Sequence, residues 1–400
     1  MRQQVIIHWG ISSFFGWGVY GLNLALAWAE DPEILPTCSR PIRLSEVSLD
    51  PLRMLRLQEF LQDSSQFDTQ LREYSAGNRH AVVDVPLLAG LGDDFRIAPT
   101  AYRMTLAGSP TIGVTFFENP DLRDDAIARA LAFDCIIAGS TWNERVLRQR
   151  GVHRVSTILQ GIDPTLFHQA PRTGYYGGRF LVFSGGKLER RKGQDIVLAA
   201  FSRFAQKHPD ALLVTAWHSP WPQFAKSLDT SNLMGPVHFT PEGKVDVRTW
   251  AIQNGVPSHQ IVDLGAVPNA LMPPILREMD VAVFPNRGEG GTNLVAMECM
   301  ACGVPVILSA NTGHLDLIAE DRVYPLWVQG RVEGMNPNPD GLQGWGESSV
   351  EEVIENLERI YLDRKEAACK AAQAAEWISE WTWQRTADSV KKIVLDHRQG

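Results

Sequence analysis

The chain has 400 residues, of which 44% are hydrophobic and 21% are charged, and its formal net charge at pH 7 is -8. This length exceeds what a single hydrophobic core usually serves, so we expect two domains. The negative charge argues against nucleic acid or an acidic membrane as the main partner of the whole chain. Five cysteines without a disulfide-like framework favour a reducing, cytoplasmic location.

The sequence shows no signal for export or for insertion into a membrane. Only residues 5–7 are apolar before His8, which is too short for the apolar region of a signal peptide. No run approaches the roughly 18 apolar residues of a membrane-spanning helix. We therefore expect no strong membrane association, although peripheral association stays open.

The first half of the chain alternates between predicted strands and predicted helices. Ser140 stands where a helix N-cap is expected, ahead of a predicted helix over residues 142–150. The predicted strands cover residues 5–9, 34–37, 81–88, 111–117, 134–138 and 155–159. Such repeated alternation predicts a parallel sheet with helices on both faces.

A predicted loop over residues 11–21 carries the pattern G-x-G-x-x-G at residues 16–21, between a strand and a helix expected over 22–30. This pattern is the fingerprint of dinucleotide binding. However, six residues separate the strand from Gly16, and the next strand leads to Cys38, Ser39 and Arg40 rather than to an acidic residue. The loop therefore fits three roles: NAD(P) binding, contact with a ligand phosphate or acceptor, or a structural turn.

The second half repeats the alternation after a segment rich in turn residues, 171–178, which is the best linker in the sequence. Its predicted strands cover residues 180–183, 211–216, 260–264, 280–284 and 304–308, and a helix is expected over 193–204. Residues 217–247 contain four prolines and form an insertion of unknown role. An irregular stretch at 330–346 precedes two helices, over 350–360 and 363–397, and the last of these carries Trp377, Trp381 and Trp383.

We therefore predict an α/β protein with two Rossmann-like, doubly wound domains facing each other across a cleft. The expected domains are residues 1–172 and residues 173–376, and a C-terminal helix over about 377–400 is expected to cross back to the first domain. In open α/β sheets ligands lie at the carboxyl ends of the strands, which places the predicted site in the cleft.

Residues 284–303, FPNRGEGGTNLVAMECMACG, join a predicted strand to a predicted helix through a glycine-rich turn, and Gly303 and Pro305 close the helix. The free N–H groups and the positive dipole end at such a helix start suit phosphate or another anion. Glu289 and Glu298 bracket the turn and would repel phosphate directly, so we expect them to accept hydrogen bonds from hydroxyls. Phosphate together with hydroxyls indicates a sugar nucleotide.

A second turn, GGKLERRKG at residues 185–193, is basic and also joins a strand to a helix. Lys187 and Lys192 carry compact positive charges that suit a diphosphate, whose developing charge must be neutralised when it leaves. For each lysine alone, a solvated charged loop is the alternative. Of Arg190 and Arg191, which lie between the lysines, we expect one to be a surface residue.

Taken together, these motifs resemble those of the retaining glycosyltransferases of family 4 (glycosyl transferases group 1), which have the two-Rossmann GT-B fold. GKLERRKG corresponds to the family's G-R-L-x-x-x-K-G, with Lys187 in place of the arginine and Lys192 in register. The segment ECMACGVPV at residues 298–306 corresponds to the end of the family's E-x7-E motif and the residues after it. Further matches are ILQGID at 158–163, LGAV at 264–267 and SANTG at 309–313, so the resemblance covers about residues 134–313. One departure is that eight residues separate Glu289 from Glu298, so either Glu289 or Gly290 holds the first acidic position.

The resemblance implies transfer of a sugar from a nucleoside-diphosphate sugar, with UDP or GDP as the nucleotide, retention of anomeric configuration and no metal or other cofactor. The implied catalytic residues are Lys187, Lys192 and Glu289. The implied donor-binding residues are these three together with Gly16, Gly18, Gly290, Gly291, Thr292, Asn293, Leu294 and Glu298. His80 and Glu118 are candidates on the acceptor side; a structural role fits Glu118 equally well, and His80 is the weaker candidate of the two. The acceptor is expected to be a carbohydrate, a glycan or another small molecule, and the lack of a polybasic amphipathic helix disfavours a lipid.

Two rival functions remain at this point. One is an NAD(P)-dependent oxidoreductase that uses residues 16–21, and the other is a non-catalytic, nucleotide-binding partner subunit. Asp93 and Asp94 fit a surface turn better than a cation site. His8 and Trp17 are weaker candidates for the acceptor side.

Overall fold

The computed structural model describes residues 2–335 and 341–397, and the chain divides into two units. Unit 1 comprises Met1–Asp163, Pro268–Ala270 and Trp381–Gly400, and unit 2 comprises Pro164–Val267 and Leu271–Glu380. The division falls earlier in the chain than the expected linker at 171–178. Residues of that segment instead belong to unit 2, because Arg172 Nη1 pairs with Asp280 at 2.9 Å and Gly174 N donates to Glu278 at 3.0 Å.

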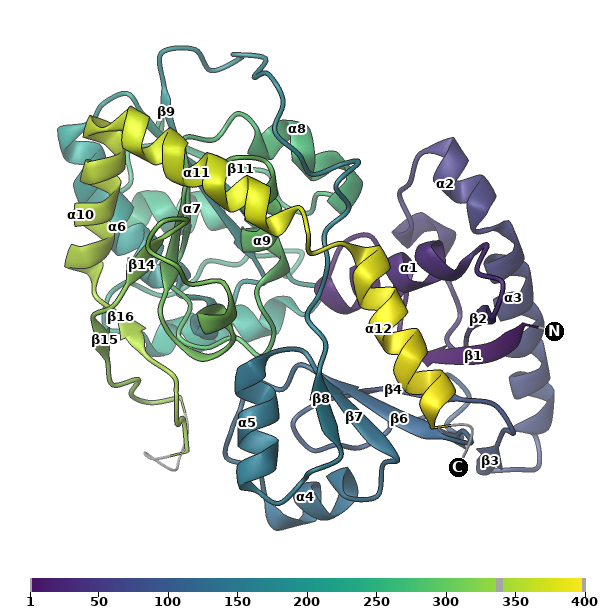
Figure 1. The fold of residues 1–400 in the computed structure, drawn as a ribbon. Coiled ribbons are helices and arrows are strands. Elements are labelled where there is room, and N and C mark those ends of the chain that lie inside the picture. The colour runs from purple at the N-terminus through teal and green to yellow at the C-terminus, as the bar shows by residue number, and fades with distance from the viewer. Residues whose placement is uncertain (1, 336–340, 398–400) are drawn as a thin grey trace. The chain divides into compact units, whose positions relative to one another are not determined.

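Unit 1 is built on a six-stranded parallel sheet (Figure 1). In sheet order its strands are β2 (Ile34–Cys38), β1 (Gln3–His8), β4 (Leu87–Leu91), β6 (Thr111–Thr115), β7 (Cys135–Ala138) and β8 (Val155–Thr157). Its helices are α1 (Gly16–Trp28), α2 (Pro51–Arg56), α3 (Gln58–Tyr74), α4 (Asp124–Ala130), α5 (Thr141–Gln149) and α12 (Trp383–Asp396), with a 3-10 turn, η1 (Leu44–Glu46). The parallel strand–helix alternation expected of this half is confirmed.

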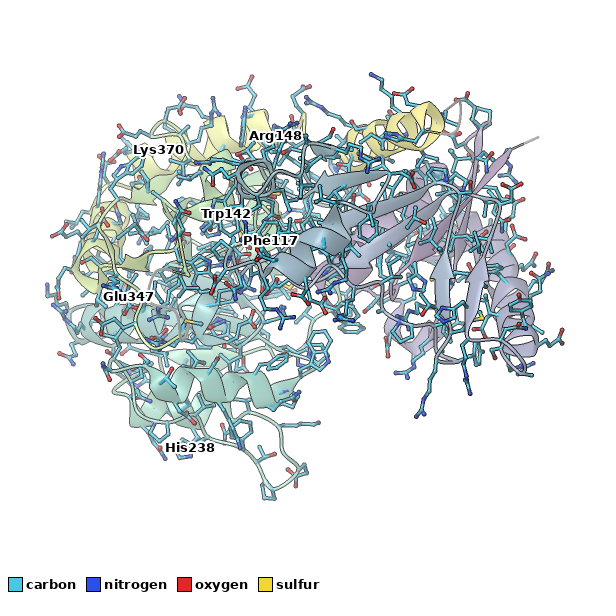
Figure 2. All side chains as sticks on the ribbon, turned by 90° about the horizontal axis from the view of Figure 1, so that it is seen from below. Phe117, Trp142, Arg148, His238, Glu347 and Lys370 are labelled. Atoms are coloured by element: carbon cyan, nitrogen blue, oxygen red, sulfur yellow. The ribbon has the colours of Figure 1, made fainter. Side chains whose placement is uncertain are left out.

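Helix α5 begins where its sequence predicts. The Ser140 hydroxyl accepts a hydrogen bond from Asn143 N at 3.1 Å, which satisfies one of the free donors at the helix start. The Asn143 amide in turn donates to the Phe117 carbonyl at 2.8 Å. The rings of Phe117 and Trp142 lie 5.7 Å apart, so the helix start is packed against the end of β6 (Figure 2).

The predicted loop over residues 11–21 is wrong in its second half, because Gly16–Gly21 form the first turns of α1. A Cβ on Gly18 would lie 2.6 Å from Ser12 N, and one on Gly21 would lie 2.6 Å from Trp9 Nε1. The last two glycines therefore allow the helix to pack closely on the segment that precedes it. Residues 16–21 thus lie within a helix and not in a turn between a strand and a helix.

The strand predicted over 81–88 is also wrong as a single element. It consists of β3 (His80–Val82), which pairs with the short β5 (Thr105–Ala107), and of the central strand β4. Pro86 lies between β3 and β4 and has no N–H to contribute to a sheet.

Unit 2 has a second six-stranded parallel sheet, with the strand order of a doubly wound nucleotide-binding fold. In sheet order its strands are β11 (Ile261–Asp263), β10 (Ala211–Trp217), β9 (Phe180–Gly186), β12 (Val281–Phe284), β13 (Val306–Ser309) and β14 (Tyr324–Leu326). Its helices are α6 (Gln194–Lys207), α7 (Val247–Gln253), α8 (Met272–Leu276), α9 (Leu294–Ala301), α10 (Val350–Leu362) and α11 (Arg364–Ile378). Helices α6, α7 and α10 contribute to one apolar core with the sheet, and α11 packs on α9.

The order of the unit 2 strands reverses between β9 and β12, which pair directly. Three 3-10 turns, η2 (Arg190–Lys192), η3 (Pro222–Thr230) and η5 (Thr312–Asp316), and a small hairpin of β15 (Gln329–Gly330) and β16 (Glu347–Ser348) complete the described elements of unit 2. A further 3-10 turn, η4 (Asn269–Leu271), has its first two residues in unit 1 and its last in unit 2. Residues 336–340 of the irregular stretch expected at 330–346 lie outside the described residues. The insertion predicted at 217–247 contains η3, whose Ala225 and Leu228 are buried in the core of unit 2.

The single helix predicted over residues 363–397 is wrong, because it is divided into α11 and α12. Between them the backbone is held by Ile162: Ile162 N donates to Trp381 O at 2.7 Å, and Trp383 N donates to Ile162 O at 3.1 Å. These bonds replace the helical ones. Trp383 is buried and its ring lies 5.6 Å from that of Tyr20 on α1, so this tryptophan packs α12 against α1 in unit 1.

Candidate donor site in unit 2

The basic turn begins where β9 ends and is brought against the end of β12. Lys187 follows β9, and η2 presents Arg191 and Lys192. Gly193 has a φ of 72°, and a Cβ there would lie 2.3 Å from Pro285 O. A glycine is therefore needed for the basic turn to pass so close to the acidic turn.

The acidic turn runs from Pro285 to Asn293 and ends at the start of α9. It is anchored by Arg287, which is fully buried and forms a two-fold ion pair with Asp195 at 2.8 and 2.7 Å. Arg287 N also donates to Arg191 O at 2.7 Å, and its side chain reaches Glu347 at 2.8 Å. Because a buried charge without its partner is costly, the ion pair fixes the acidic turn to the start of α6, and the bond to Arg191 O joins it to the basic turn.

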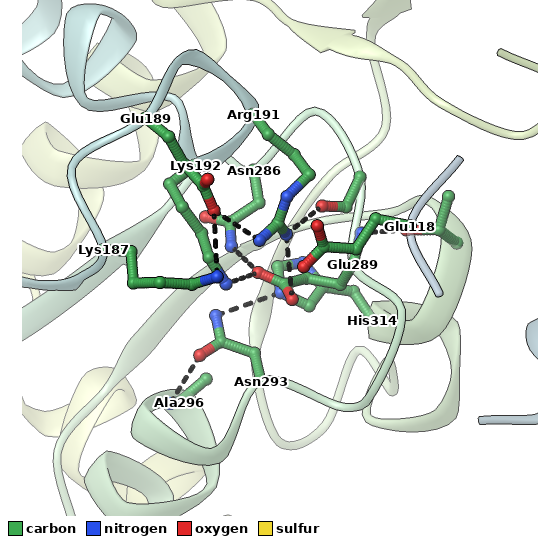
Figure 3. A network of polar contacts seen from close by, with 12 residues as sticks. Glu118, Lys187, Glu189, Arg191, Lys192, Asn286, Glu289, Asn293, Ala296 and His314 are labelled. Carbon is green, nitrogen blue, oxygen red and sulfur yellow. Dashed lines mark hydrogen bonds and ion pairs between the residues drawn. The ribbon is translucent and has the colours of Figure 1, made fainter. Parts of the chain in front are cut away.

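The two turns meet at the carboxylate of Glu289, which is only 5% exposed (Figure 3). Its Oε1 accepts from Lys192 Nζ and from the Asn286 side-chain amide, and its Oε2 lies 3.3 Å from Arg191 Nη1. Burial alone would raise the pKa of Glu289, but the charges of Lys192 and Arg191 outweigh it and lower the pKa to about 2. Glu289 is therefore ionised at neutral pH.

A second carboxylate, Glu189, balances the remaining positive charge. Arg191 Nη2 lies 2.6 Å and Lys187 Nζ 3.7 Å from Glu189 Oε1. Lys187 is the most exposed of the three cations, with 35% of its side chain accessible, and its ammonium lies 5.9 Å from the Trp221 ring centroid. We call Lys187, Glu189, Arg191, Lys192 and Glu289 the charge cluster; it carries three positive and two negative charges.

The residues expected to bind a donor fall into two groups. Lys187, Lys192, Glu289 and the turn from Gly290 to Leu294 are brought together at the junction of β9, β12 and α9 in unit 2. Glu298 lies on α9 and is 3% exposed. Gly16 and Gly18 lie in unit 1, on the first turn of α1, so the structure does not place them in this cluster.

The acceptor-side candidates lie in unit 1. His80 is exposed on β3, and Glu118 is half-buried after β6, with its N–H donating to Asp93 Oδ1 at 3.2 Å. Asp94 Oδ1 accepts from Arg96 N at 3.1 Å, a local bond of the kind found in a surface turn, whereas Asp93 bonds to Glu118, 25 residues further along the chain. His8 is buried on β1, where Nε2 lies 2.7 Å from Ala98 O, and burial lowers its pKa to about 4. Trp17 packs edge-on to Phe116, with 4.9 Å between ring centroids.

Sequence reasoning assigned no role in the site to Arg191, Asn286, Thr312 or His314, each of which contacts the charge cluster or its turn. Arg190 and Arg191 are both 4% exposed, so the expectation that one is a surface residue is wrong. Arg191 holds Glu189 and Glu289 together, Asn286 donates to Glu289, and Thr312 accepts from Glu289 N at 2.7 Å. The only visible signal was the run of two arginines. Polar residues follow many strands, and the sequence alone does not show which of them reach the cluster.

Neither a metal cluster nor a membrane span is found in the described part of the chain. Within residues 2–335 and 341–397, no group of three or more His, Cys, Asp or Glu side chains is placed to hold a metal ion. Over the same residues, no helix combines the length and the apolar character needed to cross a bilayer.

Residues 178–335 match the family model of glycosyl transferases group 1, and this segment contains the whole charge cluster. The chain is 26% identical over 238 residues to the phosphatidyl-myo-inositol mannosyltransferase of Mycobacterium tuberculosis, which covers 59% of this chain and 52% of that protein. It is 27% identical over 196 residues to the D-inositol 3-phosphate glycosyltransferase of Thermobifida fusca, which covers 44% of this chain and 38% of that protein. The chain thus spans about half the length, or less, of these curated relatives.

Solved structures match over nearly the whole chain. Sucrose-phosphate synthase from Thermosynechococcus elongatus superposes with a TM-score of 0.66 at 16% identity and covers 99% of both chains. HepE from Anabaena, in complex with UDP and glucose, gives a TM-score of 0.63 at 12% identity and covers 99% of this chain and 100% of that one. Identities this low establish the fold alone. With its two doubly wound units the chain has the GT-B fold of these solved structures, and its segment 178–335 is similar to glycosyl transferases group 1.

Proposed function

We propose that this protein is a retaining glycosyltransferase that takes a sugar from a nucleoside-diphosphate sugar. The observation that carries the proposal is the charge cluster beside the start of α9, at the point where the strand order reverses: Lys192 and Arg191 contact Glu289, and Lys187 pairs with Glu189. Nucleotides bind at this point in doubly wound folds. The relatives named above are glycosyltransferases by name, and the segment that contains the cluster matches the family model of glycosyl transferases group 1.

In this proposal the positive side chains act on the diphosphate. Lys187 and Lys192 neutralise the charge that develops on the leaving diphosphate, and the backbone N–H groups of Gly290 to Leu294 bind its oxygens. Mutational precedents put such a donor at about 3–4 kcal/mol of transition-state stabilisation. Arg191 contributes mainly through Glu289, which it contacts at 3.3 Å.

The carboxylates act on hydroxyls. Glu289 accepts hydrogen bonds from the transferred sugar, and Glu298 from the ribose. The buried contact of Glu289 with Lys192 supports Glu289, rather than Gly290, as the first acidic residue of the motif. Its lowered pKa of about 2 keeps it an acceptor at neutral pH.

The reaction exchanges one bond at the anomeric carbon for another on the same face of the sugar. The bond from the anomeric carbon to the diphosphate oxygen breaks, a bond to the acceptor oxygen forms, and the leaving diphosphate takes the acceptor's proton. The protein then needs only to position the reactants and to stabilise charge. Unit 1 supplies the acceptor site, with His80 and Glu118 as candidates, and no metal is required.

The nucleotide is UDP or GDP, and the acceptor is a hydroxyl-bearing molecule such as a carbohydrate or a cyclitol. A relative from M. tuberculosis is named as GDP-mannose-dependent, whereas HepE was solved with UDP and glucose. Inositol appears in the names of the M. tuberculosis and T. fusca relatives. A cytoplasmic location fits these soluble substrates.

A thermal-shift panel of UDP, GDP, ADP and their sugars tests the donor site. A ligand at 100 times its Kd stabilises the native state by about 2.7 kcal/mol. We expect UDP or GDP to raise the melting temperature of the wild-type protein and to have a much smaller effect on Lys192→Ala. If no nucleotide raises it, the donor site is wrongly assigned; a shift by NADH alone would favour the oxidoreductase. Binding without turnover for any donor would favour a non-catalytic subunit.

A further inference from the structure

The turn from Glu289 to Asn293 is held at both ends by three consecutive residues that follow β13. Glu289 N donates to Thr312 Oγ1 at 2.7 Å, and Gly313 N donates to Glu289 O at 3.0 Å. At the other end, the Asn293 amide nitrogen lies 3.1 Å from His314 Nε2. We call Thr312, Gly313 and His314 the clamp.

The clamp approaches the turn too closely for a side chain at its centre. A Cβ on Gly313 would lie 1.9 Å from Gly291 O and 2.9 Å from Glu289 O. Because these are backbone atoms, they cannot move aside as the end of a flexible side chain would. The turn and the clamp therefore form one packed unit.

Asn293 is the residue of the turn whose backbone most needs support. It has a φ of 64° and a ψ of 87°, a left-handed conformation that residues other than glycine adopt rarely. Its Oδ1 accepts from Ala296 N at 3.4 Å and so caps α9, while its amide nitrogen reaches His314. The Asn293 side chain is thus fixed at both of its polar atoms, and with it the start of the helix.

The contacts of His314 define which of its nitrogens carries the proton. His314 is fully buried, and its Nδ1 lies 3.2 Å from Ser309 O and 2.9 Å from Ser309 Oγ. Ser309 Oγ donates to Asn286 O at 2.7 Å, so it accepts from His314, and Nδ1 carries the hydrogen. Nε2 is then free to accept from the Asn293 amide.

A charged His314 would break this arrangement, since Nε2–H would then face the N–H of Asn293. Burial lowers the pKa of His314 to about 4; Lys192 and Arg191 also lower it, while Glu289 opposes them. The imidazole is therefore neutral at pH 7 and able to accept.

We infer that His314 is a positioning residue for donor binding, which acts by holding Asn293 so that the first N–H groups of α9 face the donor diphosphate. This inference rests on the proposed function. His314 neither transfers a proton nor touches the donor: its whole effect passes through the hydrogen bond to Asn293. None of the motifs in the sequence includes His314, and only the folded chain brings it to the turn.

Two substitutions separate this role from a merely structural one. In His314→Gln the side-chain amide reaches the place of Nε2 and can still accept from Asn293. In His314→Asn the shorter amide stays near the place of Nδ1, so the contact with Ser309 is kept and the contact with Asn293 is lost. Both variants are polar and smaller than histidine, so they disturb the packing to a similar extent.

The measurements are the Kd of UDP and GDP by calorimetry, kcat and KM with the donor sugar, and the urea midpoint of each variant. We expect His314→Asn to raise the Kd and the donor KM about tenfold, as loss of one buried hydrogen bond does. His314→Gln should stay within about threefold of the wild type. In an Asn293→Gly background, where φ of 64° carries no strain, His314→Asn should have no further effect on Kd.

The outcomes distinguish this inference from the proposed function. If the wild type binds UDP or GDP but the two His314 variants bind equally well or equally badly, the positioning role is refuted and the proposed function stands. The same holds if the effect of His314→Asn persists in the Asn293→Gly background. If the wild type binds no nucleoside diphosphate at all, the proposed function is refuted, and the inference with it.

Discussion

Replacing Glu289 by glutamine removes one charge from the centre of the charge cluster with almost no change of shape. In the wild type the Glu289 carboxylate is 5% exposed and contacts Lys192, Arg191 and Asn286. Glutamine can still accept hydrogen bonds from Lys192 and Asn286 through its Oε1, whereas its amide nitrogen takes the place of the oxygen that contacts Arg191 and cannot accept. The substitution therefore tests the charge of the residue rather than its volume.

The size of the effect on stability follows from the pKa of Glu289. The pKa falls from an ordinary value of 4.5 to about 2, and at about 1.4 kcal/mol per unit this favours the ionised form in the native state by about 3 kcal/mol. Because the group is buried, solvent screens this little. We expect the free energy of unfolding of Glu289→Gln at pH 7 to be lower than that of the wild type by about 3 kcal/mol.

The same values give the pH dependence. A carboxylate with a lowered native pKa stabilises the protein fully above its unfolded pKa of 4.5, and this contribution disappears as the pH falls towards about 2. The difference in unfolding free energy between the wild type and Glu289→Gln should therefore stay near its full value at pH 5 and shrink to about 1 kcal/mol at pH 3. Urea titrations of both proteins at pH 7, 5 and 3 measure it.

The effect on ligands should run in the opposite direction. Removing the Glu289 charge leaves three positive charges against one negative charge in the cluster. A unit charge at about 4 Å is worth about 1 kcal/mol even at the dielectric of water, so UDP or GDP should bind about fivefold more tightly. Turnover should nevertheless fall, because the contact with the donor sugar is weakened.

Glu189→Gln is the matched control. It removes the same charge from the same cluster, where Glu189 contacts Arg191 and Lys187, but it lies outside the turn that is proposed to bind the sugar. We expect it to tighten diphosphate binding as Glu289→Gln does while keeping most of the turnover. The reasoning is refuted if Glu289→Gln is as stable as the wild type at pH 7, or if the two variants lose turnover equally.

Three further predictions concern residues at other distances from the cluster. Lys192→Ala should lose turnover by about 100-fold or more, the value of one transition-state donor, while far-UV circular dichroism stays unchanged; wild-type rates would remove Lys192 from the site. Gly313→Ala places a Cβ 1.9 Å from Gly291 O, so the unfolding free energy should fall by about 1–3 kcal/mol with loss of nucleotide binding in calorimetry; full binding would contradict the close packing of the clamp. Ser140→Ala removes the cap from Asn143 N and should cost about 1 kcal/mol in urea titrations without changing nucleotide affinity, since it lies in unit 1.

The sequence by itself determined the elements whose signals are local. Ser140 caps α5 as its type and position predict, and Gly303, with a φ of 74°, ends α9 where the sequence places the end. Both residues can be recognised from the sequence because each end of a helix has local requirements. The start needs a partner for its free N–H groups, and the end commonly needs a residue in the left-handed conformation. The two doubly wound sheets follow from the alternation of such elements.

The sequence also determined the centre of the candidate site. Lys192 and Glu289 are 97 residues apart, yet each follows a buried strand by a few residues. Because nucleotides bind where parallel strands end, the two turns were expected to meet, and β9 and β12 are neighbours in the sheet. No local signal in the sequence predicts the strand order, which is what makes β9 and β12 neighbours.

Only the tertiary structure decided which residues support that centre and where long helices begin and end. In the sequence Arg191 resembles a surface charge, and only the fold places Glu189 and Glu289 beside it. In the same way, only the fold brings His314 to Asn293. Gly16 and Gly18 match a phosphate-binding fingerprint but lie in a helix, since Gly18 packs on Ser12. In each case the conformation is stabilised by burial and by hydrogen bonds between segments that meet only when the chain has folded. A local sequence pattern therefore cannot predict it.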